Sequence, residues 1–346
     1  MSKIKVLIVD DSELMRQLLS AIIGSTNDME VVATAEDPLD AREKIKQFNP
    51  DVLTLDIEMP RMDGITFLRN LMRLRPMPVV MISTLTEKGA PATLEALEIG
   101  AVDFLVKPNG DDWASVSQYA RVIQEKVRQA AAANVSHFNK LVQSKTKKIA
   151  KASYDYRKVI VIGSSTGGVE AIRQILQAMP ENSPAILLAQ HIPASFSASL
   201  AHRLDAKSTI KVQEAAEGMK IEPGHAYLAN GDFHLEVAQK GDAYFTRLNS
   251  AEKVNRHRPS VDVLFDSAVR HVGKHTVGVI LTGMGSDGAN GLKSIFDVGG
   301  STFAQDEETS VVWGMPSAAI RLNAVQQVLP IEKIPKAILK ACEIHS

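Results

Sequence analysis

The strongest constraint on the fold is a regular alternation of short apolar runs with helix-like patterns in the first 106 residues. Five of the apolar runs have the length and composition of strands: Ile4–Val9, Val31–Thr34, Val52–Leu55, Val79–Ile82 and Phe104–Val106. Helical spacing of apolar residues separates them, as at Leu14, Leu18 and Ile22. Strands that alternate with helices predict a parallel, doubly wound sheet, and five strands suit a flavodoxin-like (βα)5 domain.

A second α/β block begins near residue 157. Apolar strand-like runs recur at Val159–Ile162, Ala185–Ala189 and Val277–Leu281, with helical segments such as Glu170–Met179. Between residues 210 and 245 the pattern changes to short extended pieces broken by glycine-containing turns, which predicts hairpins. We therefore expect a second doubly wound, parallel-sheet α/β domain that carries a β-hairpin insertion.

The charge is segregated along the 346 residues, although the net charge is only −1. Residues 1–120 carry 12 Lys and Arg against 19 Asp and Glu, residues 121–158 carry 10 against 2, and the remainder carries 17 against 19. A basic segment between two such blocks is typical of a solvated linker. No aromatic stacking platform or helix-turn-helix pattern accompanies it, so we expect no nucleic-acid partner. The predicted domains are 1–125, a basic linker at 126–156, and 157–346.

The composition is that of a cytoplasmic protein. No apolar run approaches the length of a membrane span, and the N-terminal sequence is acidic too early for a signal peptide. The one cysteine, Cys342, excludes an internal disulfide and a cysteine metal cluster. We expect no membrane insertion.

Polar residues follow the predicted strands of the first domain. Asp10 and Asp11 come after the first strand, Asp56 ends the third, Ser83 ends the fourth and Lys107 ends the fifth. The carboxyl ends of parallel strands meet at one edge of the sheet, and three carboxylates there need a cation such as Mg²⁺. A double Asp is also typical of a helix N-cap, and Lys-Pro of a turn. Five polar groups at strand ends favour a site.

This set resembles the receiver domain of two-component response regulators, and the likeness covers the whole first block. It implies that Asp56 accepts a phosphoryl group from a histidine kinase, while the three carboxylates help to bind Mg²⁺. It also implies that Lys107 contacts the phosphoryl group, that Ser83 is the hydroxyl switch, and that Phe104 occupies the aromatic switch position.

The stretch Gly163–Gly168, GSSTGG, opens the second domain after a strand and before a helix. A P-loop needs Lys and then Ser or Thr after its last glycine, where Val169 and Glu170 stand. A dinucleotide fingerprint needs glycine at Ser165 and an acid where the next strand ends in Gln-His. The G-x-S-x-G turn fits, because it raises a serine hydroxyl clear of the sheet in front of helix N–H groups. Ser165 is the candidate nucleophile.

A nucleophilic serine needs a base and an acid that orients the base. His191 ends a strand that should lie beside the Ser165 strand, and Asp287 lies in a glycine-rich loop after the run at 277–281. Six other histidines of this block lie in polar or turn-like surroundings and are set aside: His202, His225, His234, His257, His271 and His275.

The combination resembles the chemotaxis protein-glutamate methylesterase/glutamine deamidase family, CheB, over nearly the whole chain. The motifs that carry the likeness are GSSTGG, AQHIP, HRPSVDVLF, LTGMGSDGANG and AQDEETSVVWGMP. It implies that Ser165, His191 and Asp287 form a catalytic triad, and that Thr166 and Met284 lie beside the oxyanion and substrate.

The likeness also implies a reaction and partners. The substrate is a γ-methyl ester on glutamates of chemoreceptor cytoplasmic helices, methanol is released, and glutamine deamidation is a companion activity. The esterase needs no cofactor, a chemotaxis histidine kinase phosphorylates the receiver, and the unphosphorylated receiver blocks the cleft. Two other classes stay open at this point: a transcriptional response regulator, and a non-catalytic binding module with the same fold.

Overall fold

The structure is a computed structural model that describes residues 2–83, 89–107, 113–135 and 149–344. The chain forms two compact units, Met1–Gln143 and Ser144–Ser346. Pro108 and the middle of the predicted linker lie outside the described residues. Within the described residues, no helix combines the length and the apolar character that crossing a membrane requires.

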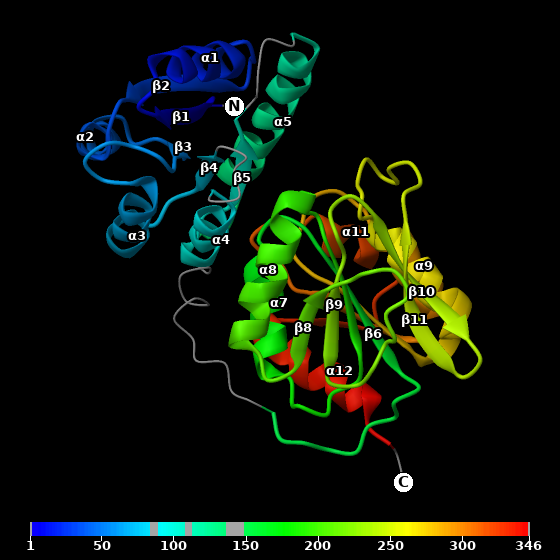
Figure 1. The fold of residues 1–346 in the computed structure, drawn as a ribbon. Coiled ribbons are helices and arrows are strands. Elements are labelled where there is room, and N and C mark those ends of the chain that lie inside the picture. The colour runs from blue at the N-terminus through cyan, green and yellow to red at the C-terminus, as the bar shows by residue number, and fades with distance from the viewer. Residues whose placement is uncertain (1, 84–88, 108–112, 136–148, 345–346) are drawn as a thin grey trace. The chain divides into compact units, whose positions relative to one another are not determined.

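The first unit is a five-stranded sheet with the order β2-β1-β3-β4-β5, and every strand pair is parallel. Its strands are β1 (Ile4–Val9), β2 (Met29–Ala35), β3 (Val52–Asp56), β4 (Val79–Ser83) and β5 (Asp103–Val106). Its helices are α1 (Glu13–Gly24), α2 (Pro38–Phe48), α3 (Gly64–Leu74), α4 (Gly89–Ile99) and α5 (Trp113–Ala131) (Figure 1). All five predicted strands and the predicted (βα)5 class are confirmed.

The second unit is built on a seven-stranded sheet with the order β14-β13-β12-β6-β7-β9-β8. These strands are β6 (Val159–Ser164), β7 (Ile186–Gln190), β8 (Lys211–Glu214), β9 (His225–Leu228), β12 (Thr276–Ile280), β13 (Ser301–Gln305) and β14 (Gln327–Leu329). All their pairings are parallel, which confirms the predicted doubly wound sheet. β6, β7 and β12 are buried along their whole length, as expected for central strands covered on both faces.

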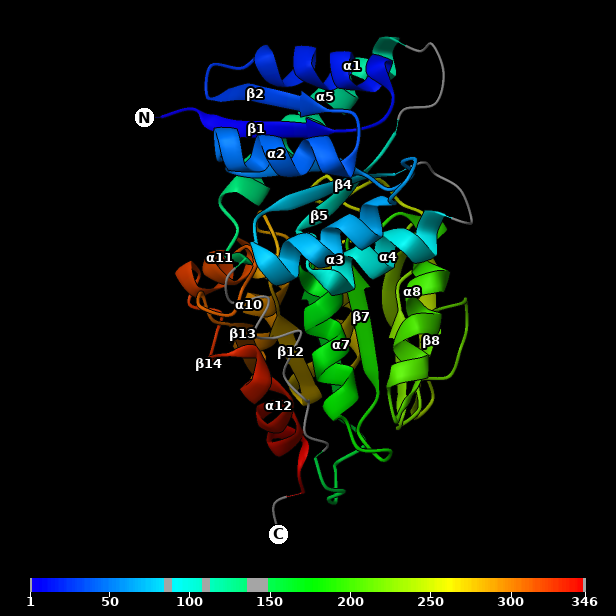
Figure 2. The same ribbon diagram turned by 90° about the vertical axis from the view of Figure 1, so that its left-hand side faces the viewer.

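Helices cover both faces of this sheet. The helices are α7 (Gly168–Ala178), α8 (Ala194–Lys207), α9 (Val261–His271), α10 (Ala289–Asp297), α11 (Met315–Arg321) and α12 (Ile334–Cys342), with short 3-10 turns η1 (Gly273–His275) and η2 (Ile331–Lys333). α7, α8 and α12 group on one face, and α9 packs with α10 on the other (Figures 1 and 2). Both faces are therefore apolar and buried, which leaves the strand ends as the place for polar chemistry.

The prediction of hairpins between residues 210 and 245 is right for one pair and wrong for another. β10 (His234–Lys240) and β11 (Ala243–Asn249) form an antiparallel hairpin around the turn at Lys240–Gly241. β8 and β9 instead pair in parallel, and β9 joins the main sheet beside β7. Glycine-containing turns mark where strands end, but the partner of each strand is chosen by burial against distant residues.

The segment predicted as a linker, 126–156, has two structured ends. Its first residues continue α5, and its last residues pack on the second unit. Ile149 N–H donates to the Ala178 carbonyl at 3.1 Å, and Asn182 Nδ2 donates to the Ala152 carbonyl at 2.8 Å. Residues from 149 onward therefore belong structurally to the second unit.

Candidate functional site

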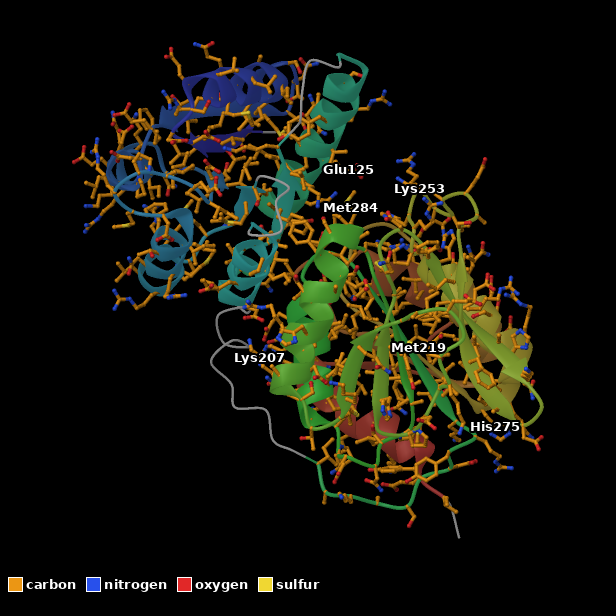
Figure 3. The ribbon with its side chains drawn as sticks, viewed as in Figure 1. Glu125, Lys207, Met219, Lys253, His275 and Met284 are labelled. Carbon is orange, nitrogen blue, oxygen red and sulfur yellow. The ribbon has the colours of Figure 1, made fainter. Side chains whose placement is uncertain are left out.

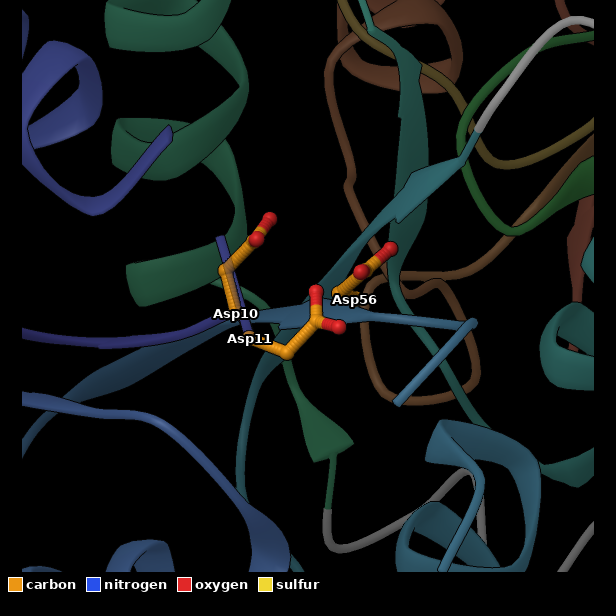
Figure 4. Close-up of side chains that lie close together, drawn as sticks. All are labelled: Asp10, Asp11 and Asp56. Carbon is orange, nitrogen blue, oxygen red and sulfur yellow. The ribbon is translucent and has the colours of Figure 1, made fainter. Parts of the chain in front are cut away.

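An acidic cluster lies at the carboxyl edge of the first sheet. Ligand atoms of Asp10, Asp11 and Asp56 lie within 4.8 Å of one another (Figure 4). The N-cap role that a double Asp could have filled belongs to Ser12, whose Oγ accepts from Met15 N–H in the first turn of α1. Asp10 Oδ1 in turn accepts from Ser12 N–H at 2.9 Å. The three carboxylates are thus held together without being needed to cap the helix.

Lys107 is the counter-ion of this cluster. Its Nζ lies 3.1 Å from Asp10 Oδ2 and 2.9 Å from Asp56 Oδ2, two buried oxygens that accept no other hydrogen bond from the described residues. Burial and, secondarily, the charge of Asp10 raise the pKa of Asp56 to about 6, against the opposing effect of Lys107. Burial lowers the pKa of Lys107, but the two carboxylates outweigh it and the net shift is upward. Among the described residues, one ammonium faces three carboxylates, which is too little positive charge, so the donor set fits a divalent cation with oxygen ligands.

The predicted switch residues Ser83 and Phe104 lie on the neighbouring strands β4 and β5, and only Ser83 is at the carboxyl edge. Ser83 ends β4, next to the β3 strand that ends in Asp56, and its Oγ accepts from Thr93 Oγ1 at 3.0 Å. Phe104 is buried in β5, and Lys126 Nζ lies 5.7 Å from the centre of its ring. The Ser83 hydroxyl therefore lies at the end of the strand next to the one that ends in Asp56, while the Phe104 ring lies near Lys126 of α5.

The second site begins with the turn between β6 and α7. Gly167 caps α7 with φ of +79°, a left-handed conformation that favours glycine. Ser165 N–H donates to the Thr282 carbonyl at 3.0 Å, and Gly168 N–H donates back to the Ser165 carbonyl at 2.7 Å. A Cβ on Gly283 would come within 2.8 Å of the Ser165 Cβ, so only glycine fits beside the serine. Ser165 is held in a tight turn at the carboxyl edge of the sheet, half-buried.

Gln190 ties this turn to the neighbouring strand. Its Oε1 accepts from Ser164 Oγ at 2.6 Å, and its Nε2 donates to the carbonyls of Ser165 at 3.0 Å and His191 at 3.2 Å. The backbone of His191 also donates to the Ser164 carbonyl at 3.1 Å. The predicted adjacency of the two strands is confirmed, and Gln190 is a functional contact that the sequence did not reveal.

His191 and Asp287 are joined directly. Nε2 of His191 lies 2.8 Å from Asp287 Oδ2. Because an ionised carboxylate only accepts, Nε2 carries the proton and Nδ1 carries the lone pair. Nδ1 is buried without a hydrogen-bond partner among the described residues, so no hydrogen bond joins it to the Ser165 hydroxyl. In the neutral imidazole, this nitrogen carries a lone pair that can accept a proton from a nearby hydroxyl.

Asp287 sits at the N-terminus of α9. Its Oδ1 accepts from Ser260 Oγ at 2.7 Å and from Asn255 Nδ2 at 2.8 Å, with Asp262 N–H more distant at 3.3 Å. Its Oδ2 accepts from Val261 N–H at 2.7 Å as well as from the imidazole. Burial raises the pKa of Asp287, but these donors outweigh burial and the net shift is downward. The carboxylate therefore stays ionised and keeps the imidazole tautomer fixed.

Thr166 and Met284 come from the two loops that meet at this turn. Thr166 is buried, and its carbonyl accepts from Thr282 Oγ1 at 3.0 Å. Met284 is 36% exposed. Figure 3 shows Met284 at the same end of the second unit as Lys253, and opposite His275. Both residues lie on the carboxyl side of β6 and β12.

His257, which was set aside as a candidate base, lies directly against His191. Its ring stacks on that of His191, with centroids 3.6 Å apart and planes 7° from parallel. Asn255, Ser260 and Asp262 were not singled out either, although all lie within hydrogen-bonding contact of Asp287. For His257, Ser260 and Asp262 the available signal was the motif HRPSVDVLF, which carried the family resemblance, whereas Asn255 lies just before this motif.

Comparisons with known proteins agree with the two-unit organisation. A family model described as "CheB methylesterase" matches residues 160–338, and one described as "Response regulator receiver domain" matches residues 6–114. Each match falls within one of the two compact units.

Full-length relatives and a solved structure are also similar. A protein-glutamate methylesterase/protein-glutamine glutaminase from Chromohalobacter salexigens is 53% identical over 343 residues, covering 99% of this chain and 97% of the relative. A protein of the same name from Photorhabdus laumondii is 54% identical over 339 residues, covering 98% of this chain and 97% of the relative. The crystal structure of the CheB methylesterase catalytic domain of Thermotoga maritima is 41% identical, with a TM-score of 0.52, and covers 53% of this chain and 97% of that chain.

Proposed function

The chain belongs to the CheB methylesterase family and carries a response regulator receiver domain, and from this premise we infer how its two sites work. It is a protein-glutamate methylesterase and protein-glutamine glutaminase of chemotaxis adaptation, regulated by phosphorylation. The substrates are glutamate γ-methyl esters and specific glutamines on the cytoplasmic helices of methyl-accepting chemoreceptors. The enzyme therefore works in the cytoplasm, with a chemotaxis histidine kinase as phosphodonor.

The hydrogen bond between His191 and Asp287 is the observation that supports the mechanism. It occupies Nε2 and leaves Nδ1 available to accept a proton. Nδ1 takes the Ser165 hydroxyl proton as Oγ attacks the ester carbonyl. The imidazolium then gives this proton to the departing methoxide, and methanol leaves. Water, deprotonated by the same nitrogen, hydrolyses the glutamyl-serine ester to free glutamate and regenerates Ser165. With a glutamine substrate, ammonia leaves in place of methanol.

The oxyanion is stabilised by hydrogen-bond donors from the two loops beside Ser165. Thr166 follows Ser165 in the turn that leads into α7, and Met284 follows the glycine that packs on the Ser165 Cβ. We assign their backbone N–H groups to the developing negative charge, supported by the positive end of α7. Acyl transfer of this type rests on these donors and uses no metal or cofactor at the esterase site.

In the receiver, Asp56 is the phosphorylation site. Asp10, Asp11 and Asp56 would hold Mg²⁺, which neutralises charge on the phosphoryl group when bound. Lys107 pairs with the phosphoryl oxygens, since it already pairs with Asp56. Ser83 and Phe104 are the switch residues, because Ser83 ends the neighbouring strand and Phe104 lies in the strand that leads to Lys107.

The decisive experiment is methanol release from methylated receptor membranes by wild type and Ser165→Ala. We expect the rate of Ser165→Ala to fall by at least about 10³-fold with the fold intact, because the residue lies in a turn and not in the core. Ser286→Ala is the matched control, since Ser286 is an exposed serine in the loop that carries Asp287. Substantial methanol release by folded Ser165→Ala would contradict the assignment of the nucleophile.

A further inference from the structure

A tight turn at Val254–His257 reaches into the esterase site from outside the predicted triad. Val254 N–H donates to the His257 carbonyl at 3.1 Å, and His257 N–H donates back to the Val254 carbonyl at 2.9 Å. The two central residues, Asn255 and Arg256, have φ of +52° and +70°. Two consecutive left-handed residues are the pattern of a type I′ turn, which is strained for arginine. Backbone strain of this kind persists where the surrounding structure fixes the conformation, and it is common near functional sites.

Asn255 connects two buried carboxylates through one amide. Its Nδ2 donates one hydrogen to Asp287 Oδ1 at 2.8 Å and the other to Asp262 Oδ2 at 2.7 Å. Both aspartates are at most 6% exposed. A charge on such a buried carboxylate is costly unless hydrogen-bond donors satisfy it. The Asp287 carboxylate cannot rotate without breaking the contact to Asn255, and its rotation would move the oxygen that holds His191.

His257 controls the other degree of freedom, the plane of the catalytic ring. The imidazoles of His257 and His191 lie nearly parallel at 3.6 Å between centroids, which is van der Waals contact over the whole face. A flat neighbour at this distance blocks rotation of His191 out of its plane. The hydrogen bond to Asp287 fixes one edge of the ring, and His257 fixes one face.

The ends of this loop are held by a buried histidine. His234 is 1% exposed, and its Nδ1 accepts from Ser260 N–H at 3.0 Å. Nδ1 is therefore unprotonated, so Nε2 carries the hydrogen and donates to the Glu252 carbonyl at 3.0 Å. Arg258 Nη1 also donates to the carbonyls of Ser250 and Ala251 at 2.9 and 3.0 Å. The turn is thus anchored on both sides and can act as a rigid support.

We propose that the Val254–His257 turn positions the catalytic pair, with Asn255 holding Asp287 and His257 holding the plane of His191. Both are positioning residues, because they act through triad members and touch no reacting atom. The inference rests on the proposed function, since it assumes that His191 is the base. Without the turn, Nδ1 of His191 spends less time aligned with the Ser165 hydroxyl, and misalignment of about 1 Å costs up to about 100-fold in rate.

The test compares His257→Ala, His257→Phe, Asn255→Ala and the control Arg256→Asn on a small substrate, the γ-methyl ester of an N-acylated glutamate amide. Arg256→Asn alters an exposed side chain of the same turn and keeps a residue type that tolerates a positive φ. We expect both alanine variants to lower kcat by about 10- to 100-fold with KM within about twofold. His257→Phe, which keeps a flat ring, should recover most of the lost kcat, and Arg256→Asn should match wild type.

Several outcomes would overturn the proposal. These are a wild-type kcat in both folded alanine variants, a His257→Phe variant as slow as His257→Ala, or a loss confined to KM. If Asn255→Ala fails to fold because two buried carboxylates lose a donor, the His257 variants carry the test alone, since His257 is only half-buried. A second readout is the imidazole proton shared by His191 and Asp287 in the proton NMR spectrum. It should be visible in wild type and Arg256→Asn, and be lost to exchange in Asn255→Ala.

Ser165→Ala and His191→Ala in the same assay separate the two levels of inference. If either keeps wild-type activity, the proposed function itself fails. If both are inactive while the turn variants behave as wild type, only the positioning role of the turn fails.

Discussion

Asp56 and Asp287 occupy equivalent places in the two units, but the pKa values of their carboxylates are shifted in opposite directions. Each lies at the carboxyl edge of a parallel sheet, and each is 2% exposed. The pKa of Asp56 is raised to about 6, chiefly by burial, whereas the pKa of Asp287 is lowered despite burial. Burial and topology alone therefore do not decide the direction in which the pKa of these carboxyl groups shifts.

The difference lies in the number of hydrogen-bond donors. Among the residues that the structure describes, Asp56 has one backbone donor, Ile57 N–H at 2.8 Å, and shares Lys107 with Asp10. Asp287 accepts from an imidazole, an amide, a hydroxyl and the N-terminus of α9. In the proposed function, the Asp56 carboxylate receives a phosphoryl group and binds a cation, so it keeps open acceptor positions, at a cost in stability. A carboxylate that only orients a base has its acceptor positions filled.

Among the tests of this contrast, we expect the largest effect on activity from Asp287→Asn. The amide keeps the shape, but it removes the charge that stabilises the imidazolium and permits the wrong tautomer, so we expect kcat to fall by about 10⁴-fold. It also presents NH₂ to donors such as Val261 N–H, so the second unit should lose about 1–3 kcal/mol. Methanol release and denaturant unfolding measure the two effects. A kcat within tenfold of wild type would show that the filled carboxylate is not needed for orientation.

Removal of the first unit tests whether the two regions are coupled. If the unphosphorylated receiver blocks the esterase, deletion of residues 1–143 should raise the basal rate by about 5- to 150-fold, the usual range of coupling free energies. The cut belongs at 143, because Ile149, Lys151 and Ala152 contact the second unit. Deletion of residues 1–158 serves as the control for loss of these contacts. A truncated enzyme slower than the unphosphorylated full chain would favour activation by direct contact instead.

The elements of the fold were largely predictable, because strand length and helical spacing are local signals. The predicted run Val159–Ile162 corresponds to β6, and Val79–Ile82 corresponds to β4, each within two residues. β13 and β14 were not predicted, and β8 and β9 were given the wrong partners. The choice of partner is a long-range property, since it depends on which apolar faces are buried together.

The site was predictable only where chemistry coincides with a strand end. Ser165, His191 and Asp287 follow three central strands, so topology brings their loops to one edge. Asn255 and His257 lie in a polar loop whose composition is that of any exposed turn. Nothing local indicates that their side chains point inward, because their partners come from other segments. The contacts of Asn255 with Asp287 and of His257 with His191 could therefore be recognised only from the three-dimensional structure.

At the receiver, the same Asp-to-Asn change should have the opposite effect on stability. Asp56→Asn removes one of several crowded carboxylates, and a rise in pKa to about 6 corresponds to about 3 kcal/mol at neutral pH. We expect the first unit to gain on the order of 2–3 kcal/mol without Mg²⁺, measured by hydrogen exchange of β3 amides in the full chain. The variant should also show no esterase response to a phosphodonor. Glu43→Gln, an exposed acid on α2, is the control. A destabilised Asp56→Asn would mean that the carboxylate is as well satisfied as Asp287.

The smallest expected effect is on the pH dependence of stability, and it compares Asp262 with Asp287 within the esterase site. Asp262 lies beside Asp287, but burial and the Asp287 charge raise its pKa, against the donors Gly291 N–H and Asn255. A raised pKa means that wild type holds the stability from Asp262 below its unfolded pKa of about 3.9 and loses it as pH rises through the higher folded pKa. Asp262→Asn does not titrate, so its stability relative to wild type should improve between pH 4 and pH 8.

Asp287→Asn should show the reverse slope. Because the folded pKa of Asp287 is lowered, this carboxylate stabilises wild type above its unfolded pKa, and the stabilisation is lost as pH falls. The loss of stability in Asp287→Asn relative to wild type should therefore be greatest at neutral pH. Denaturant unfolding of both variants and wild type at several pH values measures the two slopes in one experiment. Slopes of the same sign would mean that the two carboxylates titrate as one unit. Opposite slopes are expected, because donors reach Asp287 from four groups besides Asn255, whereas Asp262 accepts from Gly291 N–H and shares Asn255.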